Sequence, residues 1–177
     1  MDDIVKAALK KWPNVPHCYG WLGLDARGDW YLRDAATQAA GPFLQAKGSR
    51  VTHDKLREFI CRNYEHDDRG AWFFQNGPQR VYVQLEAAPL VLGVRKLAEG
   101  GYEVHTHTGL PVTAVSAAWL DEQGRLFLST PAGLGVVRSL DMDAAADALE
   151  AGLWGEPQEA TLAELMSRHA YLLDPQP

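Results

Sequence analysis

The chain has 177 residues, of which 46% are hydrophobic and 23% charged, and its formal net charge is −6. This is ordinary globular composition, and the acidic balance without a basic patch argues against nucleic acid and anionic membranes as partners. The acidic start "MDDIVKAALKKW" has no apolar signal region, and Cys18 and Cys61 form no metal-ligand motif. We therefore expect a cytoplasmic protein with reduced thiols.

The first third of the chain predicts two helices with a hairpin between them. Residues 2–12 have apolar side chains at helical spacing. Residues 18–25 and 29–33 flank the turn "DARGD" and predict a hairpin, whereas residues 34–50 are small and polar and predict irregular structure. Residues 52–64 predict the clearest helix of the chain. Its apolar face is formed by Leu56, Phe59, Ile60 and Tyr64.

The middle of the chain predicts strands, and its end predicts helices. "AWFFQ" and "QRVYVQLEA" flank an Asn-Gly pair, which is the strongest short hairpin signal. Further strands are expected in "LVLGVRKL", in "GGYEVHTHT" and at residues 113–120, 124–129 and 134–138. Helices are expected at 141–153 and 161–171, where Thr161 and Glu164 have the spacing of a capping box.

One phrase occurs three times along the chain, as "LDARGDWYLRD", "HDDRGAWFFQ" and "LDEQGRLFLST". Each copy has Asp, two residues, Gly and then a run of large apolar side chains. Asp hydrogen-bonds the backbone ahead of it and Gly accepts a left-handed conformation, so the phrase is typical of a turn that starts a strand. We interpret it as a construction unit; the copies reflect either two related halves or the convergence of hairpin turns.

These elements predict an α+β fold. Antiparallel hairpins are expected to form one or two curved sheets, packed by the helix at 52–64 and by the C-terminal helices. The length favours a single compact domain over residues 1–177. Two structural halves, at about 14–98 and 99–177, remain an alternative.

Two resemblances are carried by longer stretches of the sequence. The run from "CYGWLGLDARGDWYL" through "FICRNYEHDDRGAWFFQNGPQRVYVQLEAAPLVL" resembles a family of uncharacterised proteobacterial proteins. The words "GDWY", "GAWFF" and "VYVQLEAAPLV" are also similar to a second uncharacterised bacterial family. The second resemblance implies a mixed α+β fold of repeated motifs and a role in signalling. Neither resemblance supplies catalytic residues.

The best candidate for chemistry is the stretch "YEVHTHT". On a strand Glu103, His105 and His107 point to one face, where two imidazoles and a carboxylate could bind zinc or iron and leave a position open for substrate. The alternative is that these residues form the solvated face of a strand whose other face is buried. A fourth donor from His66 or Asp67 would favour the metal site.

The aromatic residues and the cysteines have structural and functional interpretations. The Trp72-Phe73 pair and the Trp21, Trp30 and Trp119 set can line an apolar ligand pocket or fill a core. His17 and Cys18 are adjacent, so on an extended segment their side chains point apart and do not form a catalytic pair. Cys61 lies beside the apolar face of the helix at 52–64 and is interpreted as a small packed residue.

The sequence therefore favours a non-enzymatic binding or regulatory module without a cofactor, whose partner is a protein or a small-molecule ligand. The alternative is a metal-dependent hydrolase or dioxygenase that uses zinc or iron at Glu103, His105 and His107. A third hypothesis is a structural subunit that docks on a partner through the helix at 2–12.

Overall fold

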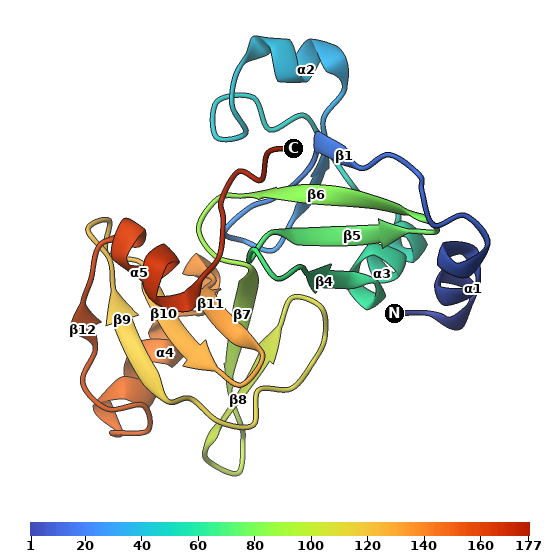
Figure 1. Cartoon of the computed structure of the whole chain (residues 1–177). Helices are drawn as coiled ribbons and strands as arrows, with labels where there is room; N and C mark the ends of the chain where they lie inside the picture. The colour runs from blue at the N-terminus through green and yellow to red at the C-terminus, as the bar shows by residue number, and fades with distance from the viewer. The chain divides into compact units, whose positions relative to one another are not determined.

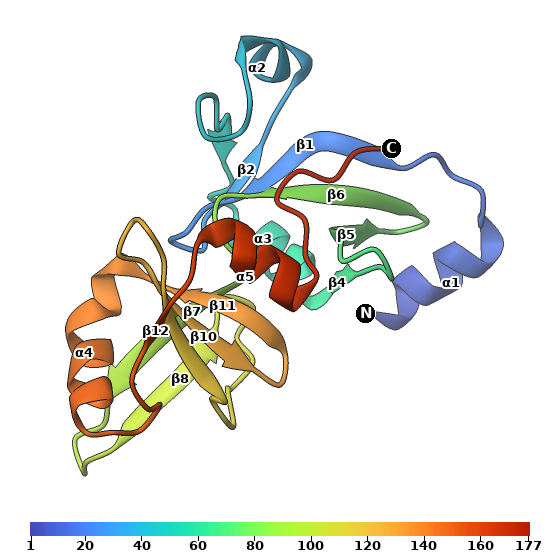
Figure 2. The ribbon, with the colours of Figure 1, turned by 60° about the vertical axis from the view of Figure 1, so that its left-hand side comes forward.

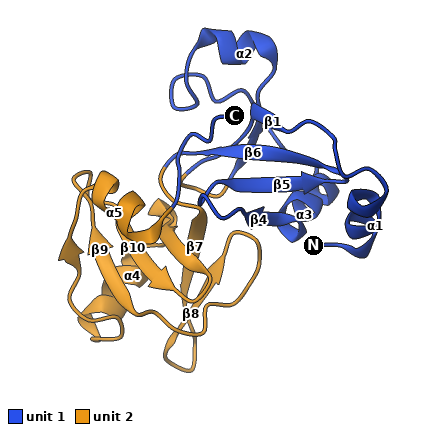
Figure 3. Ribbon diagram, in the orientation of Figure 1, with its two compact units in different colours: residues 1–25, 29–86, 171–177 blue, residues 26–28, 87–170 orange.

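The computed structural model describes all 177 residues and divides the chain into two compact units (Figure 3). Unit 1 comprises residues 1–25, 29–86 and 171–177, and unit 2 comprises residues 26–28 and 87–170. Each unit contains one six-stranded sheet together with helices. The α+β class predicted from the sequence is confirmed.

Sheet A, in unit 1, has the strand order β3-β2-β1-β6-β5-β4. Its strands are β1 (Cys18–Leu24), β2 (Trp30–Leu32), β3 (Ser49–Arg50), β4 (Tyr64–His66), β5 (Trp72–Asn76) and β6 (Gln79–Leu85). Neighbouring strands are antiparallel except for β1 and β6, which are parallel. This central parallel pair joins the hairpin β1-β2 to the meander β4-β5-β6.

Three helices accompany sheet A, namely α1 (Asp3–Lys11), α2 (Ala35–Ala40) and α3 (Asp54–Arg62). Helix α3 packs against β5 (Figure 1), where the ring of Phe59 meets that of Phe74 edge-on at 5.5 Å between centroids. Helix α1 buries only Val5, and the Asp2 N–H before it donates to Oδ1 of Asn63 at 2.7 Å. Buried side chains lie on both faces of sheet A, with Phe74 toward α3 and a cluster of Ala71, Phe73 and Tyr82 on the other face.

Sheet B, in unit 2, has the strand order β12-β9-β10-β11-β7-β8. Its strands are β7 (Leu90–Lys96), β8 (Tyr102–Thr106), β9 (Ala117–Leu120), β10 (Leu126–Thr130), β11 (Gly133–Val137) and β12 (Gln158–Glu159). Its helices are the 3-10 turn η1 (Ser139–Asp141), α4 (Met142–Glu150) and α5 (Leu162–His169). Helix α4 packs on β7 (Figure 2), and the capping box of Thr161 and Glu164 starts α5 as predicted.

The repeated Asp-x-x-Gly phrase forms the same turn three times, between β1 and β2, β4 and β5, and β9 and β10. In each copy the Asp carboxylate accepts the backbone N–H four residues ahead, at 3.0 Å for Asp25, 3.0 Å for Asp67 and 2.8 Å for Asp121. The glycines at 28, 70 and 124 have φ of 87°, 76° and 72°. Because each turn joins an antiparallel pair, the phrase is a construction unit, as the sequence predicted.

Several details differ from the sequence prediction. The sheets are mixed, because β1 and β6, β7 and β11, and β9 and β12 pair in parallel. Residues 35–40, expected to be irregular, form α2, whose first turn is capped by Asp34. Tyr64, expected on the helix at 52–64, begins β4 instead. No helix combines the length and the apolar character that a membrane-spanning helix requires.

Candidate functional site

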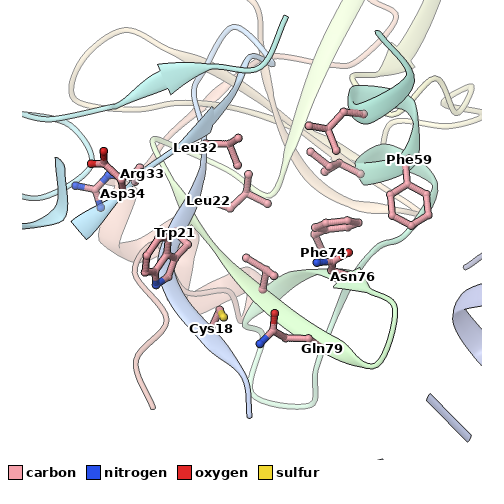
Figure 4. A pocket seen from close by; sticks show the side chains of 13 residues that line it. Cys18, Trp21, Leu22, Leu32, Arg33, Asp34, Phe59, Phe74, Asn76 and Gln79 are labelled. Carbon is pink, nitrogen blue, oxygen red and sulfur yellow. The ribbon is translucent and has the colours of Figure 1, made fainter. Parts of the chain in front are cut away.

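A cavity of about 500 Å³ opens in unit 1 between α3 and one face of sheet A (Figure 4). Its walls come from β1, β2, β5, β6 and α3, and most of the lining is apolar. The lining residues are Cys18, Trp21, Leu22, Leu32, Arg33, Asp34, Leu56, Phe59, Ile60, Phe74, Asn76, Gln79 and Val81. The cavity therefore offers mainly hydrophobic contacts, with polar groups near its edges.

An irregularity in β1 places two consecutive side chains in this cavity. Cys18 pairs with Val81 and Leu22 with Val83, so β1 uses four residue steps where β6 uses two. Successive residues of a regular strand face opposite sides, whereas a bulge re-aims one of them. Trp21 and Leu22 consequently both line the cavity, and Trp21 remains 48% exposed.

Gly20 is the residue that permits this bulge. Its φ is 78°, a left-handed value that glycine adopts without strain. A Cβ atom at this position would also lie 2.7 Å from Oε1 of Gln38. The sequence Gly20-Trp21 is thus the local origin of the exposed indole.

The side chain of Arg33 ties the bulge to the loop that follows α2. Its Nη1 donates to the carbonyl of Gly20 at 3.5 Å and to Oε1 of Gln84. Its Nη2 donates to the carbonyl of Gly41 at 2.6 Å, and Nε donates to that of Ala46 at 2.9 Å. Arg33 is only 2% exposed, so its guanidinium stabilises the fold through these internal hydrogen bonds.

The acidic group at the same end of the cavity is also engaged. The carboxylate of Asp34 accepts the Thr37 N–H at 2.8 Å, and this hydrogen bond lowers the pKa of Asp34.

The two cysteines differ in position, since Cys18 lines the cavity and Cys61 does not. Burial raises the pKa of the Cys61 thiol, which keeps it protonated and weakly nucleophilic.

The predicted metal ligands lie in unit 2, around the end of β8. Glu103 and His105 belong to the strand, whereas His107 follows it in a turn. Glu103 pairs with Arg95 at 2.5 Å between Oε2 and Nη2, and the hydrogen bond from Arg95 lowers the pKa of Glu103. Nδ1 of His107 accepts the Val91 N–H at 3.1 Å, and burial lowers the pKa of His107 to about 3.

No group of three or more His, Cys, Asp or Glu side chains that could hold a metal ion is found in the structure. Binding of zinc or iron at Glu103, His105 and His107 has no support in this geometry and stays a prediction. Elemental analysis of untagged protein tests it. Near-stoichiometric metal that is lost in the His105→Ala/His107→Ala variant would establish the site, and metal-free protein after reconstitution would refute it.

The aromatic residues that the sequence singled out have divided roles. Trp30, Trp72, Phe73 and Trp119 are buried in the cores, whereas Trp21 lines the cavity beside α3. Leu56 and Phe59, expected on the buried face of a helix, line the cavity as well. The signal that could have separated Trp21 from the other tryptophans is the glycine before it, because glycine permits the bulge.

The architecture is similar to that of two solved structures. The fold resembles a DUF1285 family protein from Silicibacter pomeroyi DSS-3, with a TM-score of 0.50 and 13% identity over 83% of this chain and 84% of that one. A DUF1285 family protein from Shewanella baltica OS155 is similar with a TM-score of 0.48 and 17% identity, over 72% of this chain and 91% of that one. No curated protein matches the sequence.

The structure defines the class of the protein as α+β, with one mixed six-stranded sheet in each of its two units. Within this class the family described as "Protein of unknown function (DUF2946)" matches residues 1–174, and the chain belongs to that family. The resemblance to an uncharacterised family, stated from the sequence, is confirmed.

Proposed function

We propose that this protein is a non-enzymatic binding module that holds an apolar small molecule in the cavity of unit 1. Two features support the proposal. The cavity volume of about 500 Å³ is within the usual range of ligand sites, roughly 300–1,000 Å³. The lining is dominated by aliphatic and aromatic side chains, which suit an apolar ligand better than a polar one.

The observation that carries the proposal is the exposure of Trp21 at the cavity. Trp21 and Leu32 are each 48% exposed and Leu56 is 36% exposed, and all three line the same space. A ligand that covers them would remove apolar surface from water, which contributes roughly 25 cal/mol per Å². The bulge at Gly20 leaves this indole half exposed at the cavity, where a bound ligand would cover it.

A cytoplasmic location and a bacterial source are part of the proposal. Neither Cys18 nor Cys61 forms a disulfide, which suits a reducing compartment. The two similar solved structures come from Shewanella baltica and Silicibacter pomeroyi, which supports a bacterial source.

Titration with N-phenyl-1-naphthylamine, an uncharged apolar fluorophore, tests the proposal. We expect saturable 1:1 binding to the wild-type protein, read as probe fluorescence and as an increase in melting temperature, because a ligand of the folded state stabilises it. The Leu32→Trp variant should fill the cavity and weaken binding at least about tenfold. Leu32 is half exposed, so the added ring does not overpack a core.

Leu44→Trp is the matched control, because Leu44 is 62% exposed in unit 1 and does not line the cavity. It should bind the probe as the wild type does. Absence of saturable binding, or equal binding by both tryptophan variants, would contradict the proposal.

A further inference from the structure

The two charged side chains at the cavity both make hydrogen bonds within the protein, although Arg33 is buried and Asp34 is exposed. Arg33 and Asp34 are the charged residues of the lining, and Figure 4 shows them together at one end. Arg33 directs its guanidinium to three backbone carbonyls and to Gln84, whose Nε2 donates to the carboxylate of Asp174 at 2.7 Å. The carboxylate of Asp34 caps α2.

An anionic ligand group would therefore lose water in the cavity without gaining a counter-ion. Burying an ionised group without a partner is strongly unfavourable, whereas a neutral polar group needs only a hydrogen bond. Arg33 is the one cationic residue of the lining. Its hydrogen-bond partners are neutral, so its positive charge would favour an anionic ligand. Arg33 is only 2% exposed and its donors are occupied by internal acceptors, so it lacks the free fork that recognises a carboxylate.

Neutral polar groups stand at another part of the lining, where β5 turns into β6. Asn76 ends β5 and Gln79 begins β6, and Figure 4 shows both side chains beside Phe74 and Cys18. Nε2 of Gln79 donates to the carbonyl of Pro16 at 2.9 Å, which leaves its Oε1 as an acceptor. The Asn76 amide is exposed and keeps both its donor and its acceptor for a ligand.

We infer that the ligand of this cavity is an uncharged, largely apolar molecule with one neutral hydrogen-bonding group, such as a hydroxyl or a primary amide, that lies against Asn76 and Gln79. This inference rests on the proposed function and specifies its ligand class. The apolar part of the molecule packs on Trp21, Leu22 and Phe59, and the amides select a neutral head group over a carboxylate.

Matched pairs of probes separate this inference from the proposed function. N-phenyl-1-naphthylamine and 8-anilino-1-naphthalenesulfonate share one ring system and differ by the sulfonate. Decanamide and decanoate share one chain and differ in head-group charge, and both are used to displace the neutral fluorophore. At pH 8 we expect the neutral member of each pair to bind at least about tenfold more tightly than the charged one.

The Asn76→Leu variant tests the role of the amide. Its affinity for decanamide should fall about threefold to tenfold, the usual effect of one hydrogen bond, and an unchanged melting temperature of the ligand-free protein shows that the variant is folded. Asn14→Leu changes an exposed amide outside the cavity and should alter neither the affinity nor the melting temperature.

Three other results would each overturn part of the inference or the proposed function. If the sulfonate or decanoate binds as tightly as its neutral counterpart, the inference is overturned while the binding function stands. If Asn76→Leu binds decanamide like the wild type, the assignment of the head group to Asn76 is overturned. If none of the four molecules binds, the proposed function itself fails.

Discussion

At the scale of single residues, His107 is a side chain whose protonation is strongly affected by burial. Its Nε2 is buried and its Nδ1 accepts the Val91 N–H, so the ring is held in the neutral form. Burial lowers its pKa from 6.5 to about 3. Above about pH 6.5 the folded and unfolded chains are both neutral at this residue, and below it only the unfolded chain binds a proton. The free energy of unfolding must therefore decrease as the pH falls below 6.5.

Replacing His107 by asparagine should remove this pH dependence. The amide oxygen of the new side chain keeps an acceptor for the Val91 N–H, and an amide does not titrate. Between pH 6.5 and 5, the free energy of unfolding of the wild type should fall by about 1.5 kcal/mol more than that of His107→Asn. Urea denaturation at several pH values measures both.

The exposed His53 provides the control, since His53→Asn should leave the wild-type slope intact. Burial also lowers the pKa of His169, so part of the slope should remain in His107→Asn. Identical slopes for the wild type and His107→Asn would contradict the assignment.

At the scale of elements, the loop after α2 packs on β1 at a position where β1 has a glycine. Phe43, in the loop after α2, is buried against Gly23 of β1. A Cβ atom on Gly23 would lie 2.2 Å from Cε2 of Phe43, well inside van der Waals contact. The same loop is held by the hydrogen bonds from Arg33 to Gly41 and Ala46, so the ring has little freedom to move.

Gly23→Ala should therefore destabilise unit 1 by about 1–3 kcal/mol, the usual cost of overpacking. Combining it with Phe43→Leu should recover part of this loss, because the smaller side chain relieves the clash. A double-mutant cycle from urea denaturation measures the coupling between the two sites. Strictly additive effects would show that the two positions do not touch.

The prediction of elements from the sequence succeeded where local signals were strong. The hairpin at Asn76, the helix within 52–64 and the capping box at Thr161 all depend on residues a few positions apart. Strands β3, β4 and β12 are only two or three residues long and were missed. Such short segments carry no detectable periodicity, and they become strands because a longer neighbour offers hydrogen bonds.

At the scale of the whole molecule, the last residues of the chain belong to the unit that contains the first ones. Residues 171–177 are part of unit 1. The Leu85 N–H donates to the carbonyl of Leu173 at 2.7 Å, and the Leu172 N–H donates to that of Gly70 at 3.2 Å. Tyr171 is buried. The C-terminal segment therefore completes the hydrogen bonding around β5 and β6.

Deleting residues 171–177 should destabilise unit 1 by about 3 kcal/mol, from three lost hydrogen bonds, including that from Gln84 to Asp174, and the lost burial of Tyr171. Hydrogen exchange should become faster in peptides that cover β6 and remain unchanged in peptides that cover β10. Deleting only the exposed residues 176–177 should change neither set. Unaltered exchange at β6 in the longer deletion would refute this role of the segment.

The amino-acid sequence by itself determined the α+β class, the antiparallel hairpins and the three Asp-x-x-Gly turns. Each of these follows from hydrogen bonds and side-chain spacing within a few residues, and the turns form as expected at Asp25, Asp67 and Asp121. It also identified Trp21 among the residues able to line a pocket. Binding of metal at Glu103, His105 and His107 was predicted from strand periodicity alone, and His107 lies beyond the strand.

Only the tertiary structure decided the parallel pairing of β1 with β6, the bulge at Gly20 and the cavity beside α3. These features depend on the register between segments far apart in the chain. A shift of register by one residue would turn every side chain of a strand to the other face, and no local pattern specifies the register of distant strands. The candidate site arises at this long-range contact, because the irregular pairing of β1 with β6 occurs where Cys18, Trp21 and Leu22 of β1 line the cavity.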